Sequence, residues 1–190
     1  MTYRRTLGTF CTVAVVILVA GATPARAQLL THPKSWTVTP FLQGSTGVSG
    51  PNTDNSVGLG VAAGYDLTSN LGFEGELAHL FDVVGNDTNV DWSVTNVSAN
   101  AIYHFDVQHF TPYATFGLGF ERSSINVKSP DPLILVPPSS TEVAYNFGGG
   151  IKYRINDTLI ARADLRRFQA IDTAPDYWRL YGGLMFSLKR

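Results

Sequence analysis

Eight segments of about ten residues in this chain alternate apolar and polar side chains, separated by clusters rich in Gly, Asn, Asp, Pro and Ser. A period of two places successive side chains on opposite faces of a β-strand, so the pattern predicts strands and no amphipathic helix. The last stretch, YWRLYGGLMFSLKR, has one row of alternate residues that stays apolar almost to its end. An apolar face on every strand must be covered, and no predicted helix can cover it.

The predicted strands are 35–46, 56–67, 71–81, 92–105, 111–122, 142–154, 158–168 and 177–190. In the fourth of these, Trp92 and Val94 have the opposite parity to Val97 and Ala99. We therefore expect a β-bulge near Asn96.

The connections between these strands alternate in length. Tight turns are expected at 66–70, 106–109 and 155–158, and longer loops at 47–55, 82–91, 123–141 and 169–176. Short turns at one end, long loops at the other and an even strand number are typical of outer-membrane barrels. The predicted fold is all-β: an eight-stranded antiparallel up-and-down transmembrane β-barrel with short periplasmic turns and longer extracellular loops.

The first 27 residues have the layout of a cleaved secretory signal peptide. Arg4 and Arg5 precede an apolar core, and Ala25-Arg26-Ala27 precedes Gln28. The apolar run is about ten residues, which is too short for a spanning helix of roughly 20. We expect cleavage after Ala27, export, and a single domain over residues 28–190.

Removal of the signal also removes Arg4, Arg5, Arg26 and the one cysteine, Cys11, and leaves 11 basic against 15 acidic side chains. This net negative charge gives no reason to expect a nucleic-acid partner. A small exported domain without disulfides needs another constraint, and closing a sheet on itself provides one.

The apolar row could face lipid, or it could line a soluble lipid-binding barrel. Amphipathic aromatic residues near the strand ends favour lipid, because such rings gather at the two membrane interfaces. Two aromatic belts are expected: Trp36, Tyr65, Tyr103 and Tyr153 at the short-turn end, and Trp92, Tyr145 and Trp178 at the long-loop end.

The opposite row carries charges in mid-strand, and an eight-stranded barrel is just wide enough inside for side chains. Isolated buried charges are costly, so these charges should pair across the barrel as a polar plug. The alternative is that several of them sit in trapped water. The expected network comprises Glu74, Glu76, Arg162, Asp164, Arg166 and Arg179, with Lys152 and Arg154 lower down. Glycines on the same row would make room for the long side chains.

The C-terminal residues Tyr181, Gly183, Phe186 and Leu188 resemble the signal that hands outer-membrane barrels to the barrel-assembly machinery. The family pattern ends on an aromatic residue, whereas here Leu188 holds that position. The stretches TPYATFGLGF, YNFGGGIKYRI and ARADLRRF also resemble strands of small OmpA-like and OmpX-like barrels. The resemblance implies an integral outer-membrane protein of a Gram-negative bacterium.

Catalytic and metal-binding patterns are weak. His79 is the one histidine near the outer side, with Ser93 as the nearest nucleophile and no clear acid, so a Ser-His enzyme that modifies lipid A is a minor alternative. Neither the histidine spacing nor the loop acids Asp82, Asp87 and Asp91 match a metal site. We expect no catalytic residue, no cofactor and no metal.

We therefore expect a monomeric outer-membrane protein of structural or surface-interaction type, with a plugged interior and outer-membrane lipid around it. Its long loops, above all 123–141, would present an adhesion or recognition surface to an extracellular ligand. The alternatives are a narrow pore for small solutes, a soluble periplasmic lipid carrier and a lipid A-modifying enzyme.

Overall fold

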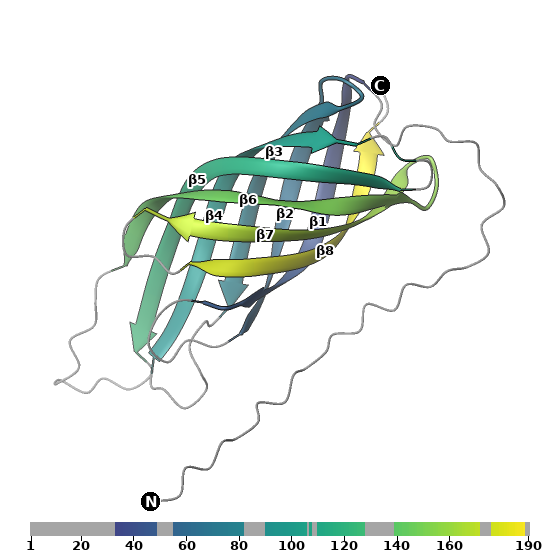
Figure 1. Cartoon of the computed structure of the whole chain (residues 1–190). Helices are drawn as coiled ribbons and strands as arrows, with labels where there is room; N and C mark the ends of the chain where they lie inside the picture. The colour runs from purple at the N-terminus through teal and green to yellow at the C-terminus, as the bar shows by residue number, and fades with distance from the viewer. Residues whose placement is uncertain are drawn as a thin grey trace, which may run out of the picture.

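The chain forms one closed antiparallel barrel in the computed structural model (Figure 1). The structure describes residues 33–48, 55–81, 90–105, 107, 110–127, 139–171 and 176–188. Each strand pairs with the next along the chain, in the order β1 (Ser35–Thr46), β2 (Ser56–Asp66), β3 (Leu71–Phe81), β4 (Val90–His104), β5 (Thr111–Val127), β6 (Ser140–Arg154), β7 (Leu159–Ala170) and β8 (Tyr177–Leu188).

The last strand pairs with the first. Trp36 lies opposite Leu188 at one end of this seam, and Thr46 lies opposite Trp178 at the other. Closure leaves neither strand with an open edge, which removes the row of unpaired backbone groups that favours aggregation. The predicted eight-stranded antiparallel barrel is thus confirmed.

Two details differ from the prediction. β4 keeps an unbroken register with β3 and β5 through Asn96, so the expected bulge is absent and Trp92 belongs to the inward row. The β5–β6 hairpin is also longer than expected, because its register runs on to Ser123 opposite Ser140. The loop predicted at 123–141 is therefore shorter, and its PLILVPP stretch lies outside the described residues, as does the predicted signal peptide.

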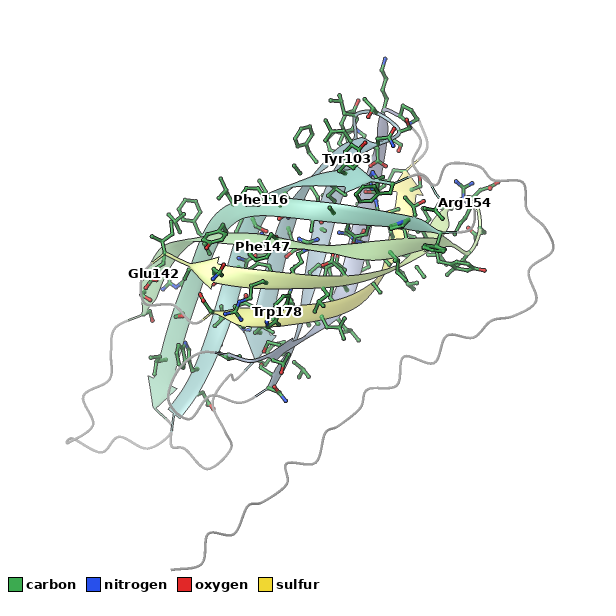
Figure 2. All side chains as sticks on the ribbon, viewed as in Figure 1. Tyr103, Phe116, Glu142, Phe147, Arg154 and Trp178 are labelled. Atoms are coloured by element: carbon green, nitrogen blue, oxygen red, sulfur yellow. The ribbon has the colours of Figure 1, made fainter. Side chains whose placement is uncertain are left out.

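The two rows of the barrel face as predicted for a membrane protein. The outward row of every strand exposes large apolar side chains, and Figure 2 shows three of them, Phe116, Phe147 and Trp178, pointing away from the barrel. The largest apolar patch on a soluble monomer is usually a few hundred Å². Apolar side chains around the whole circumference therefore require a lipid environment, and the soluble carrier with inverted rows is wrong.

The short-turn end is built from side chains that cap their own turns. Asn156 Oδ1 accepts hydrogen bonds from the backbone N–H groups of Thr158 and Leu159, at 2.9 and 2.8 Å. Thr68 Oγ1 accepts from the N–H of Leu71 at 2.9 Å in the β2–β3 turn. Such Asx- and Thr-capped turns fix the register of the strands that they join.

Among the residues that the structure describes, three small apolar clusters fill parts of the lumen in place of one core. Ile160 and Met185 pack together near the short-turn end. A middle cluster consists of Phe41, Ala62, Ala78 and Tyr181, and the cluster nearest the long loops consists of Leu80, Val94, Phe168 and Tyr177, with Val48 and Trp92 against it. Within the described part of the chain, no helix has the length and apolar character to cross a membrane.

Candidate functional site

Charged side chains from opposite walls meet in the middle of the lumen. Arg162 projects inward from β7 and binds both carboxylate oxygens of Glu74 from β3: Nη1 pairs with Oε2, and Nη2 lies 3.2 Å from Oε1. The two strands are on facing walls of the barrel, 88 positions apart in the sequence. This bidentate pair therefore crosses the lumen, and both side chains are buried.

Asp164 and Arg166 extend the pair along β7. Arg166 donates from Nε to Asp164 Oδ1 at 2.8 Å and from Nη2 to Oδ2 at 2.9 Å. Its Nη1 lies 3.3 Å from Glu76 Oε2, the second acid of β3. Each buried charge of this group therefore has at least one partner of opposite sign, as buried charges require.

Aromatic rings hold these charges in place. The Tyr113 hydroxyl donates to Asp164 Oδ2 at 2.5 Å and accepts from Arg162 Nε at 2.7 Å. The Tyr181 ring lies 5.2 Å from the guanidinium of Arg162 and 5.5 Å from that of Arg166. Cation–π contacts of this kind are stronger when the cation is desolvated, as it is here.

Arg179, on β8, joins the network from the side of the long loops. Its Nη1 lies 2.5 Å from Glu76 Oε1, and its guanidinium stacks 4.4 Å from the ring centre of Phe168. Arg179 thus connects the charge network to the apolar cluster above it.

Lys152 and Arg154 take different positions. Lys152 is buried, and its Nζ lies 2.7 Å from His104 Nε2 at the short-turn side of the network. Arg154 lies at the short-turn end of the barrel (Figure 2), where it pairs with the exposed Asp157 at 3.9 Å. Arg154 is the last residue of β6 and is half-buried, so its membership of the buried network stays a prediction.

Gly150 leaves room for the Tyr113 side chain. A methyl group on Gly150 would lie 2.5 Å from the Tyr113 hydroxyl, and closer still to the Ala163 carbonyl oxygen. A side chain at position 150 would displace the hydroxyl that joins Arg162 to Asp164.

The network includes groups that the sequence did not single out. Tyr113, His104, Glu121 and Tyr177 all face inward, and Tyr177 donates to Glu121 Oε1 at 2.5 Å near the long loops. The alternation of the sequence places these four residues on the inward rows. It does not predict which side chains they contact, because each contact joins strands that are not neighbours in the sheet.

The rings expected in the belts face outward, with one exception. Trp36, Tyr103, Tyr153 and Trp178 are exposed on the outward row, and Tyr65 and Tyr145 are half-buried on it. Trp36 and Tyr65 form a cross-strand pair with ring centres 4.9 Å apart. Trp92 instead packs against the apolar cluster inside the lumen, because β4 has no bulge to turn it outward.

The four residues of the predicted C-terminal assembly signal divide between the two faces of β8. Tyr181 is buried in the network and Gly183 is half-buried beside it, whereas Phe186 and Leu188 are exposed on the outward row. Tyr181 therefore holds the charge network together, whatever its part in assembly.

The minor catalytic candidate does not assemble. His79 Nδ1 lies 2.9 Å from Thr95 Oγ1 rather than near Ser93, and its ring packs against Phe81. Among the residues that the structure describes, no three His, Cys, Asp or Glu side chains gather as a metal site would require.

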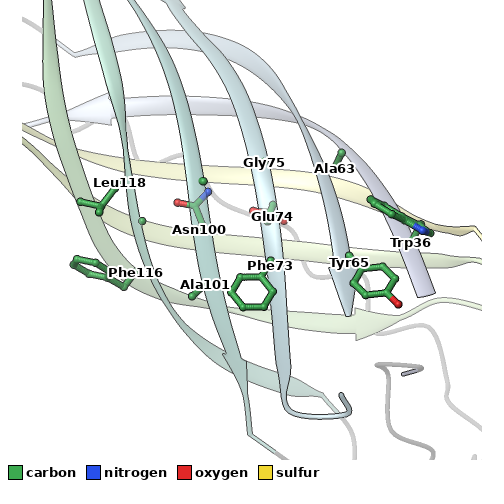
Figure 3. Close-up of a pocket in the computed structure, with 12 residues that line it drawn as sticks. Trp36, Ala63, Tyr65, Phe73, Glu74, Gly75, Asn100, Ala101, Phe116 and Leu118 are labelled. Carbon is green, nitrogen blue, oxygen red and sulfur yellow. The ribbon is translucent and has the colours of Figure 1, made fainter. Parts of the chain in front are cut away.

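A hollow of about 540 Å³ lies on the outward face over β1 to β5 (Figure 3). Trp36, Tyr65 and Phe73 border one side and Phe116 and Leu118 the other. Small residues lie between them: Ala63, Gly75, Ala99 and Ala101. The hollow is a groove in the lipid-facing surface, and the inward residues Glu74 and Asn100 also contribute to its lining.

Comparisons with known proteins agree with this geometry. Residues 12–184 match the family described as outer membrane protein beta-barrel domain. No curated protein is similar enough to this sequence to count as a match.

Solved structures show the same fold at low sequence identity. Neisserial surface protein A is 16% identical with a TM-score of 0.63, covering 81% of this chain and 97% of its own. The N-terminal barrel of Pseudomonas aeruginosa OprF is 20% identical with a TM-score of 0.58, covering 82% of this chain and 98% of its own.

Ail, the attachment invasion locus protein of Yersinia pestis, has also been solved with the heparin analogue sucrose octasulfate. In that complex it is 15% identical with a TM-score of 0.56, covering 82% of this chain and 100% of its own. The family match spans most of the sequence, and the barrel exposes an apolar row on every strand. The chain therefore belongs to the outer membrane protein beta-barrel domain family, the small transmembrane barrels of Gram-negative outer membranes.

Proposed function

We propose that this barrel is a non-conducting outer-membrane protein that stabilises the envelope and presents its long loops as an interaction surface. The observation that supports this most is the buried network that joins β3 to β7 across the lumen. Arg162, Arg166 and Tyr181 occupy the space through which a solute would have to pass. We assign no catalytic residue, because no nucleophile, base and acid come together in the described residues.

The interaction surface would lie at the long-loop end. The segment between β5 and β6 joins two long strands at this end and is the strongest candidate to bind an extracellular ligand. Ail and neisserial surface protein A, whose names denote attachment and a surface position, share this fold. At their low identity they support the type of role and not a particular ligand.

The outward rings complete the proposal. Trp36, Tyr65, Tyr103 and Tyr153 would mark the periplasmic interface, and Tyr145 and Trp178 the outer one. We further propose that the chain is exported, cut after Ala27 and assembled as a monomer by the barrel-assembly machinery. An intact mass that begins at Gln28 would support the cleavage.

Conductance tests the proposed function against its main alternative, a narrow pore. The refolded protein is inserted into a planar bilayer and single-channel current is recorded, with Arg162→Ala as the variant that loosens the plug. We expect a silent wild type, and brief openings in the variant because its lumen loses a cross-barrel side chain. Steady openings of the wild type would contradict the plug and favour the pore.

Cell attachment tests the loop role separately. Bacteria that display the full chain are compared with bacteria whose residues 128–138 are replaced by a short Gly-Ser linker, at matched surface levels. We expect attachment to drop only when the segment is replaced. Equal attachment of both strains would contradict the interaction role of this segment and leave only the structural role of the barrel.

A further inference from the structure

Arg122 places a positive charge on the lipid-facing row of β5. The outward residues before it on this strand are apolar: Phe116, Leu118 and Phe120 are 54%, 57% and 58% exposed. Arg122 is the next residue of the same row, two positions closer to the long loops, and its side chain is exposed. Because a charge is costly in the hydrocarbon of a bilayer, Arg122 marks the height at which this strand enters the headgroup region.

The neighbouring strands change from apolar to polar side chains at the same step. The outward residues directly opposed to one another on β3, β4, β5 and β6 are first Leu77, Val97, Phe120 and Val143. One step nearer the long loops, the opposed outward residues are His79, Thr95, Arg122 and Thr141. This second set, which we call the Arg122 row, is thus a continuous polar row beside a continuous apolar one.

The charge of the Arg122 row is positive. The acids next to it in the sequence, Glu121 and Glu142, have the opposite parity and belong to the alternate rows of β5 and β6. The guanidinium of Arg122 has no ion pair or hydrogen bond with any residue that the structure describes. By contrast Arg167, an outward cation of β7, is paired with Asp176 at 3.2 Å. Arg122 therefore offers its charge to the surroundings of the barrel.

We propose that the Arg122 row binds the phosphate headgroup of an anionic membrane lipid on the long-loop side of the barrel. A guanidinium forms two parallel hydrogen bonds to phosphate oxygens, which makes arginine well suited to this group. The Thr95 and Thr141 hydroxyls are on the strands at either side, roughly 5 Å away, and can donate to the remaining oxygens. His79 Nδ1 lies 2.9 Å from Thr95 Oγ1, which fixes both side chains within the row.

The apolar surface next to the row favours a lipid over a free phosphate ion. From Arg122 the outward row of β5 continues through Phe120 to Leu118 and Phe116, which border the groove shown in Figure 3. An acyl chain attached to a phosphate at Arg122 would follow this row into the groove. The proposal rests on the lipid-facing orientation of the outward row, and not on a plugged lumen or an adhesive loop.

Native mass spectrometry of the refolded full mature chain, released from an uncharged detergent, tests this site by counting bound lipid. Dioleoyl phosphatidic acid is compared with dioleoyl phosphatidylcholine, which has the same acyl chains but a phosphate neutralised by choline. We expect the wild type to bind one phosphatidic acid about ten times more tightly than phosphatidylcholine, because one exposed arginine attracts an anionic headgroup by roughly this factor.

Arg122→Gln should weaken the binding of phosphatidic acid about five- to tenfold, because the guanidinium–phosphate contact is lost. Thr141→Val keeps every charge and should weaken it about two- to fivefold through the loss of one hydrogen bond. Arg154→Gln is the matched control, since it removes the same charge from the short-turn end of the barrel, and its binding should equal that of the wild type.

A wild type without preference for phosphatidic acid would overturn the proposal. So would an Arg122→Gln variant that binds like the wild type, or an equal loss in Arg122→Gln and Arg154→Gln, which would indicate only a general attraction of charge. Inorganic phosphate at the same concentration as the lipid should not displace it. Displacement would show that the row binds free anions, and would also overturn a lipid site.

Discussion

Arg162 joins the two facing walls of the barrel and contacts both acids and aromatic rings of the interior. Its guanidinium binds Glu74 through two nitrogens, and its Nη2 lies 3.2 Å from Asp164 Oδ2. The guanidinium carbon also lies 4.9 and 5.2 Å from the ring centres of Tyr113 and Tyr181. Buried ion pairs contribute little over apolar packing, but the loss of one partner leaves the other charge stranded. Removing one member of the network should therefore destabilise the barrel more than the intact network stabilises it over apolar packing.

Replacing Arg162 by Met should lower the free energy of unfolding by about 3–5 kcal/mol, because Glu74 and Asp164 would keep buried charges with fewer partners. Urea unfolding of the barrel in lipid vesicles, followed by tryptophan fluorescence, measures this. Arg154→Met is the control: its ion pair is at the surface and should contribute no more than about 1 kcal/mol. Equal stability of Arg162→Met and wild type would mean that trapped water, and not the ion pairs, satisfies the interior.

Tyr113→Phe isolates a single hydroxyl. The change removes the donor to Asp164 and the acceptor for Arg162 while it keeps the ring, so a loss of roughly 1–3 kcal/mol is expected. Tyr103→Phe makes the same chemical change on the exposed outward row and should be nearly neutral. The same vesicle assay compares the two variants. A similar loss of unfolding free energy in both would show that the Tyr113 hydroxyl does not stabilise the network.

At the scale of the strand, alternation is a robust signal because a slip of one residue exchanges the two faces of the whole strand. This explains why all eight strands were predictable to within a few residues, apart from the hairpin ends. The prediction for Trp92 is wrong for a different reason: its change of parity predicts a bulge, whereas an apolar cluster inside the lumen contacts the ring. Aromatic character alone does not distinguish a lipid interface from a buried cluster.

The cross-barrel partners mark the limit of prediction from the sequence. Facing charges on the strands that became β3 and β7 could be matched by their depth, and Glu74, Glu76, Arg162 and Arg166 do meet. The contact from Tyr113 to Asp164 could not be predicted, because the tilt and stagger of the strands decide which side chains meet inside a barrel.

Leu118→Arg tests which face of β5 meets lipid. Leu118 is 57% exposed in mid-strand on the outward row, so a charge there should destabilise the barrel in a bilayer by roughly 2–4 kcal/mol. Thr158→Arg places the same side chain at an exposed periplasmic turn and should cost little. Vesicle unfolding with both variants checks this, and an undisturbed Leu118→Arg variant would show that β5 does not face the hydrocarbon core.

At the scale of the whole molecule, closure and filling act together. Pairing of β1 with β8 satisfies the backbone without disulfides, which a chain with one cysteine, in its expected signal peptide, cannot form within itself. The charged interior would then keep the closed wall from becoming an open channel. A barrel of this kind is a rigid scaffold, and binding residues are expected on its long loops, which tolerate sequence variation.

The central claim is that this chain is a closed barrel with its apolar row turned to lipid and its interior filled. Electrophoretic mobility of the mature chain from an outer-membrane fraction, compared between unheated and boiled samples, tests this most directly. A barrel with closed backbone pairing should resist the detergent until it is boiled, so its mobility should shift with heat. A mobility that does not change, in a protein recovered from the soluble periplasm, would contradict the account.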